Sequence, residues 1–325
     1  MDDVALFDAL APKLQRVRSE LAKVIVGQET IIDHLLIGLL CGGHCLLVGV
    51  PGLAKTLMVR SFAHVLDLDF NRVQFTPDLM PSDITGTEIL DEDAGSGHKS
   101  FRFVRGPVFT NVLLSDEINR APPRTQSALL EAMQEHHVTS AGRTYALVEP
   151  FYVLATQNPI EQEGTYPLPE AQLDRFMLML WVDYPTDEEE RRIVSLTTGE
   201  PGAGLDKVLS RQEIIEAQEL VRRVPVDGHV IARAVNTARR TRPVDGCPDF
   251  IKEWVSWGAG PRASQYLVLT AKARALLDGR KTPAVDDVDA LALPVLRHRI
   301  VTSFNAEAAG IRAEDIISRL VEATS

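Results

Sequence analysis

The sequence predicts an α/β fold, with a parallel sheet and its covering helices first and a helical domain after it. Up to about residue 184, short apolar runs typical of buried strands alternate with amphipathic helical patterns. From residue 185 onward the pattern is helix after helix, without the alternation of a strand. We therefore predict a core domain at residues 1–184 and a helical domain at residues 185–325.

Composition is that of a globular protein, with 45% hydrophobic and 24% charged residues in a chain of 325 residues. Such a length is sufficient for two hydrophobic cores. The first residues lack the pattern of a signal peptide, and no apolar run approaches the roughly eighteen residues of a membrane span, so we expect a cytoplasmic protein. The net charge of −11 disfavours a nucleic-acid surface as the main partner.

Three cysteines are too few for a disulfide framework and suit a reducing compartment. Cys41, His44 and Cys45 lie close enough in sequence to be considered as metal ligands. A helix end that runs into the next strand explains this pattern better, so we predict no metal site there.

The residues from 45 to 60 combine an apolar strand, a glycine-containing loop and the start of a helix. The strand ends at Gly49, and Lys55 and Thr56 open the helix. Backbone N–H groups of such a loop carry positive partial charge, so they can surround a polyphosphate. Lys55 would reach the β- and γ-phosphates of ATP, and the Thr56 hydroxyl would bind Mg²⁺. The predicted binding residues of this loop are Gly49, Val50, Pro51, Gly52, Leu53, Ala54, Lys55, Thr56 and Leu57.

Ala54 departs from the phosphate-loop pattern G-x-x-x-x-G-K-[ST], because it stands where the second glycine is expected. Alanine adds only a Cβ atom, so we expect the loop to form if Ala54 has a negative φ. Gly49 and Gly52 are expected to allow a close approach of the main chain and a positive φ.

An apolar turn, Val24–Gln28, lies between two predicted helices upstream of this loop. In a nucleotide-binding protein, Val26 and Gly27 of such a turn would cover the adenine ring. A plain turn between helices explains the same residues.

Asp116 and Glu117 end the apolar run that starts at Val112. Ligands of open α/β sheets bind at the carboxyl ends of the strands, so these acids are well placed for chemistry. Asp116 would hold Mg²⁺, and Glu117 would polarise the attacking water.

Two polar residues further along the chain are weaker candidates. Asn158 follows the predicted strand 151–156 and could donate to the γ-phosphate and the attacking water, or it is an ordinary turn residue before Pro159. Arg175 ends a short predicted helix, where a surface arginine is favoured by the helix dipole.

The helical part is predicted to contain seven helices, at about residues 187–198, 211–222, 228–240, 248–257, 263–278, 285–297 and 313–323. Trp254 and Trp257 are predicted to pack in its core. Arg262 stands at the start of one helix, where it is either a capping residue or part of a site.

The order of these motifs resembles the AAA+ ATPases. The stretches 49–56 and 116–121 are similar to those of the MoxR branch, in which alanine at the position of Ala54 is usual. The resemblance implies a P-loop NTPase αβα core followed by an all-helical AAA+ lid. It also implies that 49–56 is the Walker A motif and that Asp116 and Glu117 form the Walker B motif.

The same resemblance implies roles for the remaining candidates. Asn158 matches sensor 1, Arg262 matches sensor 2, and Arg175 matches the arginine finger that enters the neighbouring subunit's site. Arg120 and Arg124 are rivals for the finger role. The segments 84–103 and 138–148, both predicted as hairpins, match the helix-2 insert and the pre-sensor-1 hairpin of this clade.

The resemblance further implies a homo-hexamer that hydrolyses ATP with Mg²⁺. Its implied function is to remodel or mature client proteins, in some cases by inserting metal. A partner that bears a von Willebrand factor A domain is often involved.

Three alternatives stay open from the residues. These are a nucleotide-gated scaffold with negligible hydrolysis, a small-molecule P-loop kinase and a DNA-unwinding relative, of which the last is disfavoured by the acidic composition.

Overall fold

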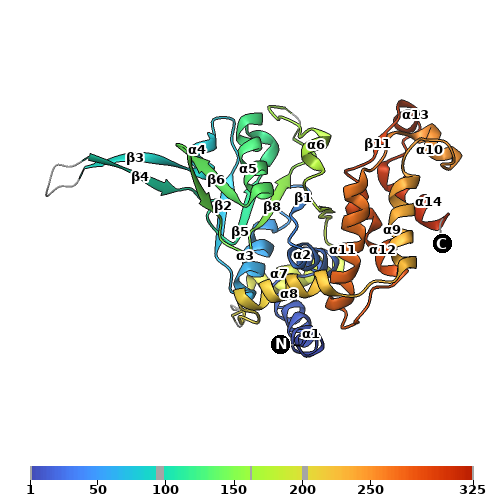
Figure 1. Ribbon diagram of the computed structural model, residues 1–325, viewed down its shortest axis with the longest axis horizontal. Helices are drawn as coiled ribbons and strands as arrows, with labels where there is room; N and C mark the ends of the chain where they lie inside the picture. Colours follow the sequence, from blue (N-terminus) through green and yellow to red (C-terminus); the bar gives the residue numbers. More distant parts are fainter. Residues whose placement is uncertain (1, 93–98, 162, 200–203, 324–325) are drawn as a thin grey trace. The chain divides into compact units, whose positions relative to one another are not determined.

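A computed structural model describes residues 2–92, 99–161, 163–199 and 204–323 (Figure 1). The chain divides into two compact units. We call the first the helical unit; it contains Met1–Cys45, Pro169–Leu180 and Gln212–Ser325. We call the second the sheet unit; it contains Leu46–Leu168 and Trp181–Arg211. The domain boundary between residues 184 and 185 stays a prediction.

A five-stranded parallel sheet confirms the predicted α/β fold, with the strand order β2-β5-β8-β1-β9. Its strands are β1 (Cys45–Val48), β2 (Phe70–Gln74), β5 (Val112–Asp116), β8 (Tyr152–Gln157) and β9 (Leu178–Trp181). In the register of β5, Asp116 lies opposite Gln74 of β2, and Ser115 lies opposite Ala155 of β8. The polar residues at the ends of these strands therefore meet at one edge of the sheet.

Two helices of the sheet unit bury apolar side chains. Helix α3 (Lys55–Val65) buries Phe62, whose ring centroid lies 6.1 Å from that of Tyr152 in β8. Helix α5 (Pro123–Glu135) buries Leu129 and Leu130 and follows the short 3-10 helix η1 (Ile118–Arg120). The strands that carry the candidate site are thus anchored in a dry core.

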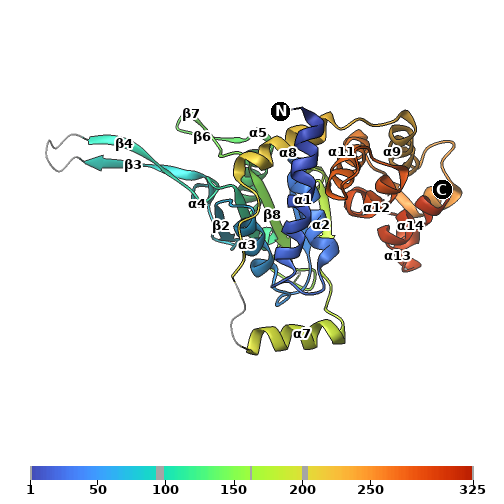
Figure 2. The same cartoon turned by 90° about the horizontal axis from the view of Figure 1, so that it is seen from below.

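Both predicted hairpins are present in the sheet unit. Strands β3 (Gly86–Glu92) and β4 (Lys99–Arg105) follow the short helix α4 (Pro81–Thr85) and form an antiparallel ribbon that extends away from the sheet (Figure 2). The tip of the predicted insert, residues 93–98, lies outside the described residues. The second hairpin consists of β6 (His137–Ser140) and β7 (Arg143–Ala146). Helix α7 (Asp187–Thr198) also belongs to this unit, and none of its residues is buried.

The helical unit is built from helices that pack on α11 (Pro261–Leu277), including α1, α2, α9 and α12. Its helices other than α11 are α1 (Asp3–Leu21), α2 (Glu29–Leu40), α6 (Glu170–Leu173), α8 (Arg211–Arg223), α9 (Gly228–Arg240), α10 (Asp249–Trp254), α12 (Val285–Leu296), α13 (Phe304–Ala308) and α14 (Ala313–Glu322). No helix in the described part of the chain is long and apolar enough to cross a bilayer.

The prediction of a helix at residues 248–257 is wrong at the C-terminal end. Helix α10 stops at Trp254, and β10 (Val255–Trp257) pairs antiparallel with β11 (Val301–Thr302). Trp257 therefore does not pack in the core, since 71% of it is exposed. The β-branched Val255 and the aromatic Trp257 favour a strand where a partner strand is available. Helix α13 was not predicted.

Candidate nucleotide-binding site

The loop between β1 and α3 depends on two glycines for different reasons. A Cβ atom added to Gly49 would lie 2.6 Å from the carbonyl oxygen of Val182, so this position has no room for a side chain. Gly52 has a φ of +87°, a conformation that other residues rarely adopt. The loop therefore brings the main chain close to its neighbours and turns it sharply before the helix.

Ala54 has a φ of 52° and a ψ of 24°, so the expectation of a negative φ is wrong. It occupies the left-handed region immediately before Lys55, where the phosphate-loop pattern has glycine. The left-handed conformation costs a residue with a Cβ atom roughly 1–2 kcal/mol. The loop thus keeps the backbone shape of a glycine loop and tolerates this strain.

A pocket of about 360 Å³ lies at the carboxyl edge of the sheet and belongs entirely to the sheet unit. It brings together five of the predicted chemical residues, Lys55, Thr56, Asp116, Glu117 and Asn158. The other lining residues are Gly49, Pro51, Gly52, Leu53, Ala54, Arg72, Gln74, Thr156 and Gln157. Leu57 does not line it, and its side chain is exposed.

The ammonium group of Lys55 donates hydrogen bonds to the main-chain carbonyls of its own loop, those of Gly49 and Val50. Partial burial lowers the pKa of Lys55, while the carboxylates of Asp116 and Glu117 oppose this shift. The lysine is therefore held at the mouth of the loop by neutral acceptors, which an anionic phosphate would outcompete.

Both carboxylate oxygens of Asp116 are engaged. Nη2 and Nε of Arg72 donate to Oδ2 at 2.7 and 3.0 Å, and the hydroxyl of Thr156 donates to Oδ1 at 2.6 Å. A cation that binds Asp116 would have to replace the guanidinium of Arg72.

Glu117 adopts a left-handed main-chain conformation with a φ of 55°. Its N–H group donates to the hydroxyl of Thr156 at 2.9 Å, and its carboxylate pairs with Nε of Arg120 at 2.8 Å. Arg120 also pairs with Glu161. The proposed general base is therefore oriented by main-chain geometry and held by a neighbouring cation.

Asn158 is buried, and its amide is only half satisfied. Oδ1 accepts a hydrogen bond from the N–H group of Ile160 at 3.1 Å, whereas the buried Nδ2 has no partner among the described residues. An unpaired buried donor is costly. This amide therefore fits a pocket built for an anionic or water ligand.

The oxygen donors of the pocket also fit a hard cation. The hydroxyl of Thr56 and the carboxylate of Asp116 are ligand types that Mg²⁺ prefers. No group of three His, Cys, Asp or Glu side chains among the described residues could hold a metal by itself. Mg²⁺ would therefore take its remaining ligands from phosphate and water, as is usual for this ion.

The remaining predicted residues belong to the helical unit. Val26 is buried in the turn between α1 and α2, and Gly27 next to it has a φ of +73°. Arg262, at the start of α11, pairs with Asp174 at 2.8 Å. Arg175 follows α6 in the turn that leads to β9. Their predicted contacts with nucleotide stay predictions.

Sequence reasoning missed the residues that hold the acids, Arg72 and Thr156. A signal for Arg72 was available, because Arg72 and Gln74 of β2 alternate with the buried Val73 and with the buried Phe75 that follows the strand. This period of two places both polar side chains on the open side of the strand. Thr156 gave no comparable signal, because a buried threonine is common in strands.

Comparison with known proteins agrees with this architecture. Residues 44–178 match the ATPase family associated with various cellular activities (AAA), and residues 251–320 match the AAA lid domain. Chaperone MoxR1 of Mycobacterium tuberculosis is 45% identical over 311 residues, which are 95% of this chain and 81% of that protein. The chain belongs to the MoxR family of AAA+ ATPases. Membership in this family favours ATPase activity over the activity of a small-molecule kinase.

Two further similarities extend over nearly the whole MoxR-family chain. Protein MoxR of Paracoccus denitrificans is 32% identical and covers 92% of this chain and 91% of its own length. A crystal structure of a protein from Cytophaga hutchinsonii is 41% identical, with a TM-score of 0.90 and coverage of 98% of this chain and 96% of that one.

Proposed function

We propose that this MoxR-family protein hydrolyses ATP at the carboxyl edge of its sheet. The observation that carries the proposal is the single pocket that contains Lys55, Thr56, Asp116, Glu117 and Asn158. These five side chains supply a cation, oxygen ligands, a base and an amide donor, which are the parts that phosphoryl transfer to water needs.

Each side chain has a distinct role in this mechanism. Lys55 leaves the carbonyls of its loop and binds the β- and γ-phosphates. Thr56 and Asp116 would hold Mg²⁺, which when bound neutralises charge on the phosphate oxygens. Glu117 accepts a proton from the attacking water, and Nδ2 of Asn158 donates to the γ-phosphate.

Arg72 and Arg120 must change partners for this chemistry to occur. Arg72 pairs with Asp116 and Arg120 pairs with Glu117, so both acids are neutralised by cations in the structure. A triphosphate brings negative charge that competes for the two guanidinium groups. Binding of nucleotide would thereby release the acids for the metal ion and the water.

We also propose roles for the residues of the helical unit, on the basis of the family. Val26 and Gly27 cover the adenine ring. Arg262 responds to the phosphates of its own subunit, and Arg175 stabilises charge on the γ-phosphate of a neighbouring subunit in a homo-hexamer. Hydrolysis would then depend on assembly.

The use of this hydrolysis is proposed to be chaperone-like remodelling or maturation of client proteins in the cytoplasm. The support is the relative named Chaperone MoxR1. A partner with a von Willebrand factor A domain and the insertion of metal into a client are parts of the same proposal. A pull-down with Glu117→Gln in the presence of ATP should retain the partner and client, whereas Lys55→Ala should not.

Nucleotide binding and phosphate release test the central proposal. Lys55→Ala should lose most affinity for ATP, because the cation at the mouth of the loop is removed. Glu117→Gln should bind ATP with the affinity of the parent. Its rate of phosphate release should be at least about 100-fold lower, because the base is lost. Lys207→Ala is the matched control, since Lys207 is an exposed lysine paired with Asp67 in the same unit.

The second candidate function is a nucleotide-gated scaffold with negligible hydrolysis. It is favoured by the pairing of Glu117 with Arg120, which occupies the base. If the parent protein binds ATP but releases no more phosphate than Glu117→Gln, the scaffold is the better description.

A further inference from the structure

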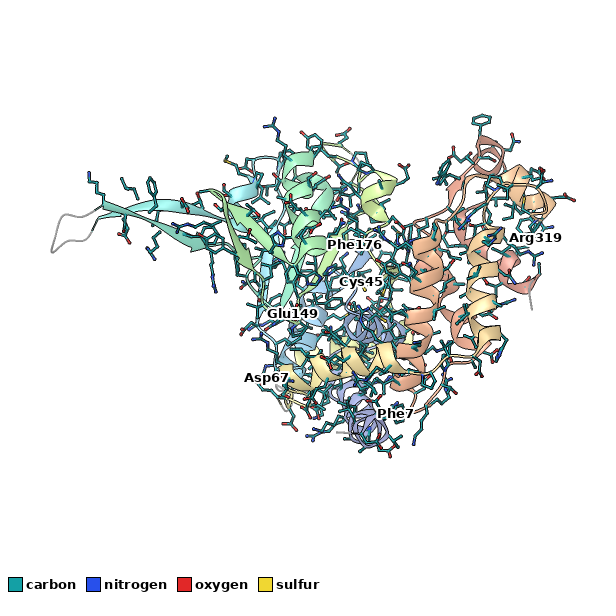
Figure 3. All side chains as sticks on the ribbon, viewed as in Figure 1. Phe7, Cys45, Asp67, Glu149, Phe176 and Arg319 are labelled. Carbon is teal, nitrogen blue, oxygen red and sulfur yellow. The ribbon has the colours of Figure 1, made fainter. Side chains whose placement is uncertain are left out.

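The turn between α6 and β9, residues 174–177, is held by one arginine of the same unit. Nη2 of Arg299 donates to the carbonyl oxygens of Asp174 at 3.0 Å and Phe176 at 2.6 Å, and Nη1 donates to that of Met177 at 3.3 Å. Only 1% of the Arg299 side chain is exposed. Phe176, labelled in Figure 3, is itself buried. One planar guanidinium therefore fixes the main chain of the whole turn.

The carboxylate of Asp174 lies between two arginines. Oδ1 accepts from Nε of Arg299 at 2.7 Å, and Oδ2 accepts from Nη1 of Arg262 at 2.8 Å. The two partners differ in their access to solvent, because 40% of the Arg262 side chain is exposed. Asp174 thus joins a buried arginine to a partly exposed one.

His298 gives the turn a second support. Nε2 of His298 lies 3.0 Å from the carbonyl oxygen of Phe176. Burial and the charge of Arg299 hold the pKa of His298 well below its usual value, so the ring is neutral and can donate from Nε2. The carbonyl of Phe176 therefore accepts from two consecutive residues of the chain.

Arg175 is the exception within this turn. Its N–H group donates to the carbonyl oxygen of Gln172 at 3.2 Å. Its guanidinium, however, forms no hydrogen bond or ion pair with any residue in the described ranges. Asp174 and Phe176, on either side, are held by Arg299, while the Arg175 guanidinium has no partner in the part of the chain that the structure describes.

We propose that Asp174 and Arg299 are positioning residues that hold Arg175 in place for its action on a neighbouring subunit. This inference rests on the proposed function of Arg175. Asp174 also binds Arg262, so the residue that precedes Arg175 in the chain is paired with the second arginine that is proposed to respond to nucleotide.

The contact of the buried Arg299 guanidinium with residues 174–177 supports a positioning role for Arg299 rather than a role in turn stability alone. Burial of a guanidinium is costly even when it is paired, and apolar side chains could close a turn of this length without that cost. What the fork of Arg299 adds is direction, since its donors fix several carbonyl groups in one plane. Fixed direction is needed where a charged group must reach a reacting atom.

Asp174→Asn tests the role with little disturbance, because an amide oxygen can still accept from Arg299. Steady-state ATPase assays should show kcat reduced roughly tenfold to a hundredfold, as expected for a misplaced catalytic group. The KM for ATP should stay within about twofold of the parent, since none of the residues that line the pocket is changed. Arg299→Lys, which keeps the charge and loses the fork, should lower kcat in the same way.

Mixed assemblies separate positioning from a general loss of structure. A Lys55→Ala subunit has an unaltered Arg175 but cannot hold ATP, whereas an Asp174→Asn subunit has an unaltered pocket. The ATPase rate of a mixture of the two variants should exceed the sum of the rates of the two variants measured separately. Arg175→Ala mixed with Lys55→Ala should give the same pattern.

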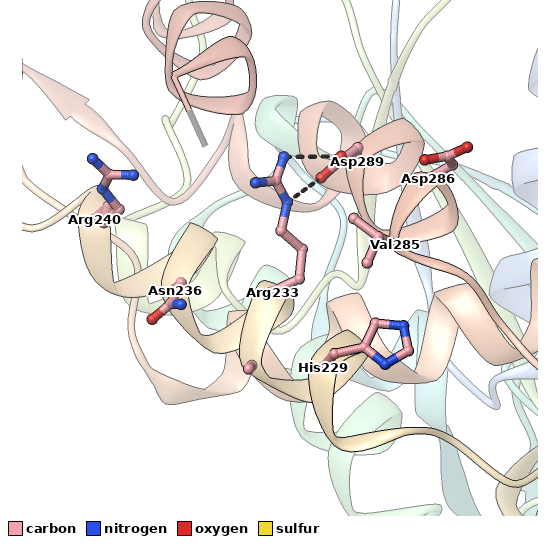
Figure 4. Close-up of a pocket in the computed structure, with 8 residues that line it drawn as sticks. His229, Arg233, Asn236, Arg240, Val285, Asp286 and Asp289 are labelled. Carbon is pink, nitrogen blue, oxygen red and sulfur yellow. Dashed lines mark hydrogen bonds and ion pairs between the residues drawn. The ribbon is translucent and has the colours of Figure 1, made fainter. Parts of the chain in front are cut away.

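The matched control is another pair of a buried arginine with a partly exposed aspartate in the helical unit, Arg233 with Asp289 (Figure 4). Its distances are 2.7 and 2.9 Å, similar to those of the pair under test. Asp289→Asn should leave kcat within about twofold of the parent, because this pair holds no residue of the proposed machinery.

The outcomes distinguish the inference from the function on which it rests. Full activity of Asp174→Asn, or low activity that Lys55→Ala does not restore, would overturn the positioning role. An equal loss of kcat in Asp289→Asn would do the same. If Arg175→Ala keeps full activity, the proposed finger itself is wrong, and the positioning role is overturned with it.

Discussion

Ala54 and Glu117, two residues of the pocket, adopt the left-handed main-chain conformation without being glycine. Each stands immediately before a helical segment, α3 in one case and η1 in the other. A conformation of this kind costs on the order of 1 kcal/mol or more and persists only where the surroundings enforce it. At residue scale, two strained main-chain conformations therefore lie where the nucleotide is proposed to bind, while Asp67, His136 and Ala141 adopt the same conformation elsewhere.

Ala54→Gly is expected to change the free energy of unfolding by less than about 1 kcal/mol. Relief of the strained φ stabilises the folded state, while the greater freedom of glycine stabilises the unfolded chain by a similar amount. Because the loop already has the shape that glycine favours, affinity for ATP should not change more than about twofold. Urea denaturation and nucleotide titration measure the two quantities.

Ala63→Gly is the control, since Ala63 lies inside α3 and is buried. Glycine in a helix interior should lower the free energy of unfolding by about 1 kcal/mol, with no strain relieved in return. An equal loss in the two variants would show that the φ of Ala54 carries no strain.

At the scale of elements, helix α2 carries a histidine that packing keeps neutral. Burial lowers the pKa of His34 to about 4, and the charges of Arg274 on α11 and Arg297 add to the shift. In the unfolded chain the pKa of this histidine is about 6.5. The unfolded state therefore binds the extra proton first, and stability falls as the pH drops below about 6.5.

His34→Gln should make the stability of the protein less dependent on pH. Between pH 7.5 and 5.5, the parent should lose about 1 kcal/mol of unfolding free energy through His34 alone. In His34→Gln the free energy of unfolding should decrease by about 1 kcal/mol less over this pH range. His64→Gln, at an exposed position of α3, should show the same decrease as the parent. Denaturation at several pH values is the measurement, and parallel curves for all three proteins would contradict the assignment.

At the scale of the whole molecule, the proposed arginine finger makes activity a property of the assembly. A site that needs Arg175 from a neighbour cannot reach its full rate in a single chain of 35.8 kDa. Hydrolysis should therefore couple to oligomerisation through mass action.

Glu117→Gln with Mg·ATP should elute as a hexamer, because bound nucleotide is not turned over and holds the subunits together. The parent ATPase rate per chain should rise with protein concentration and then level off. Size-exclusion chromatography with light scattering and dilution assays measure these effects. A fully active monomer would contradict the proposed role of Arg175.

Much of the fold follows from local patterns, which is why the sequence alone predicted it. Apolar runs predicted the strands, helical spacing predicted most helices, and the loop from Gly49 to Thr56 predicted where the pocket lies. Each of these signals is contained in a short stretch of chain, where residue type and spacing decide the conformation. The strand β10 was missed because its partner β11 lies more than forty residues away.

The sequence by itself predicted which residues carry the proposed chemistry, and the tertiary structure decided which side chains contact them. Arg72 reaches Asp116 across 44 residues, and Arg299 reaches Asp174 across 125. Such pairs leave no trace in spacing, because strand register and helix packing create them only when distant segments meet. The φ of Ala54 was decided in the same way, by the loop that surrounds it rather than by the residue itself.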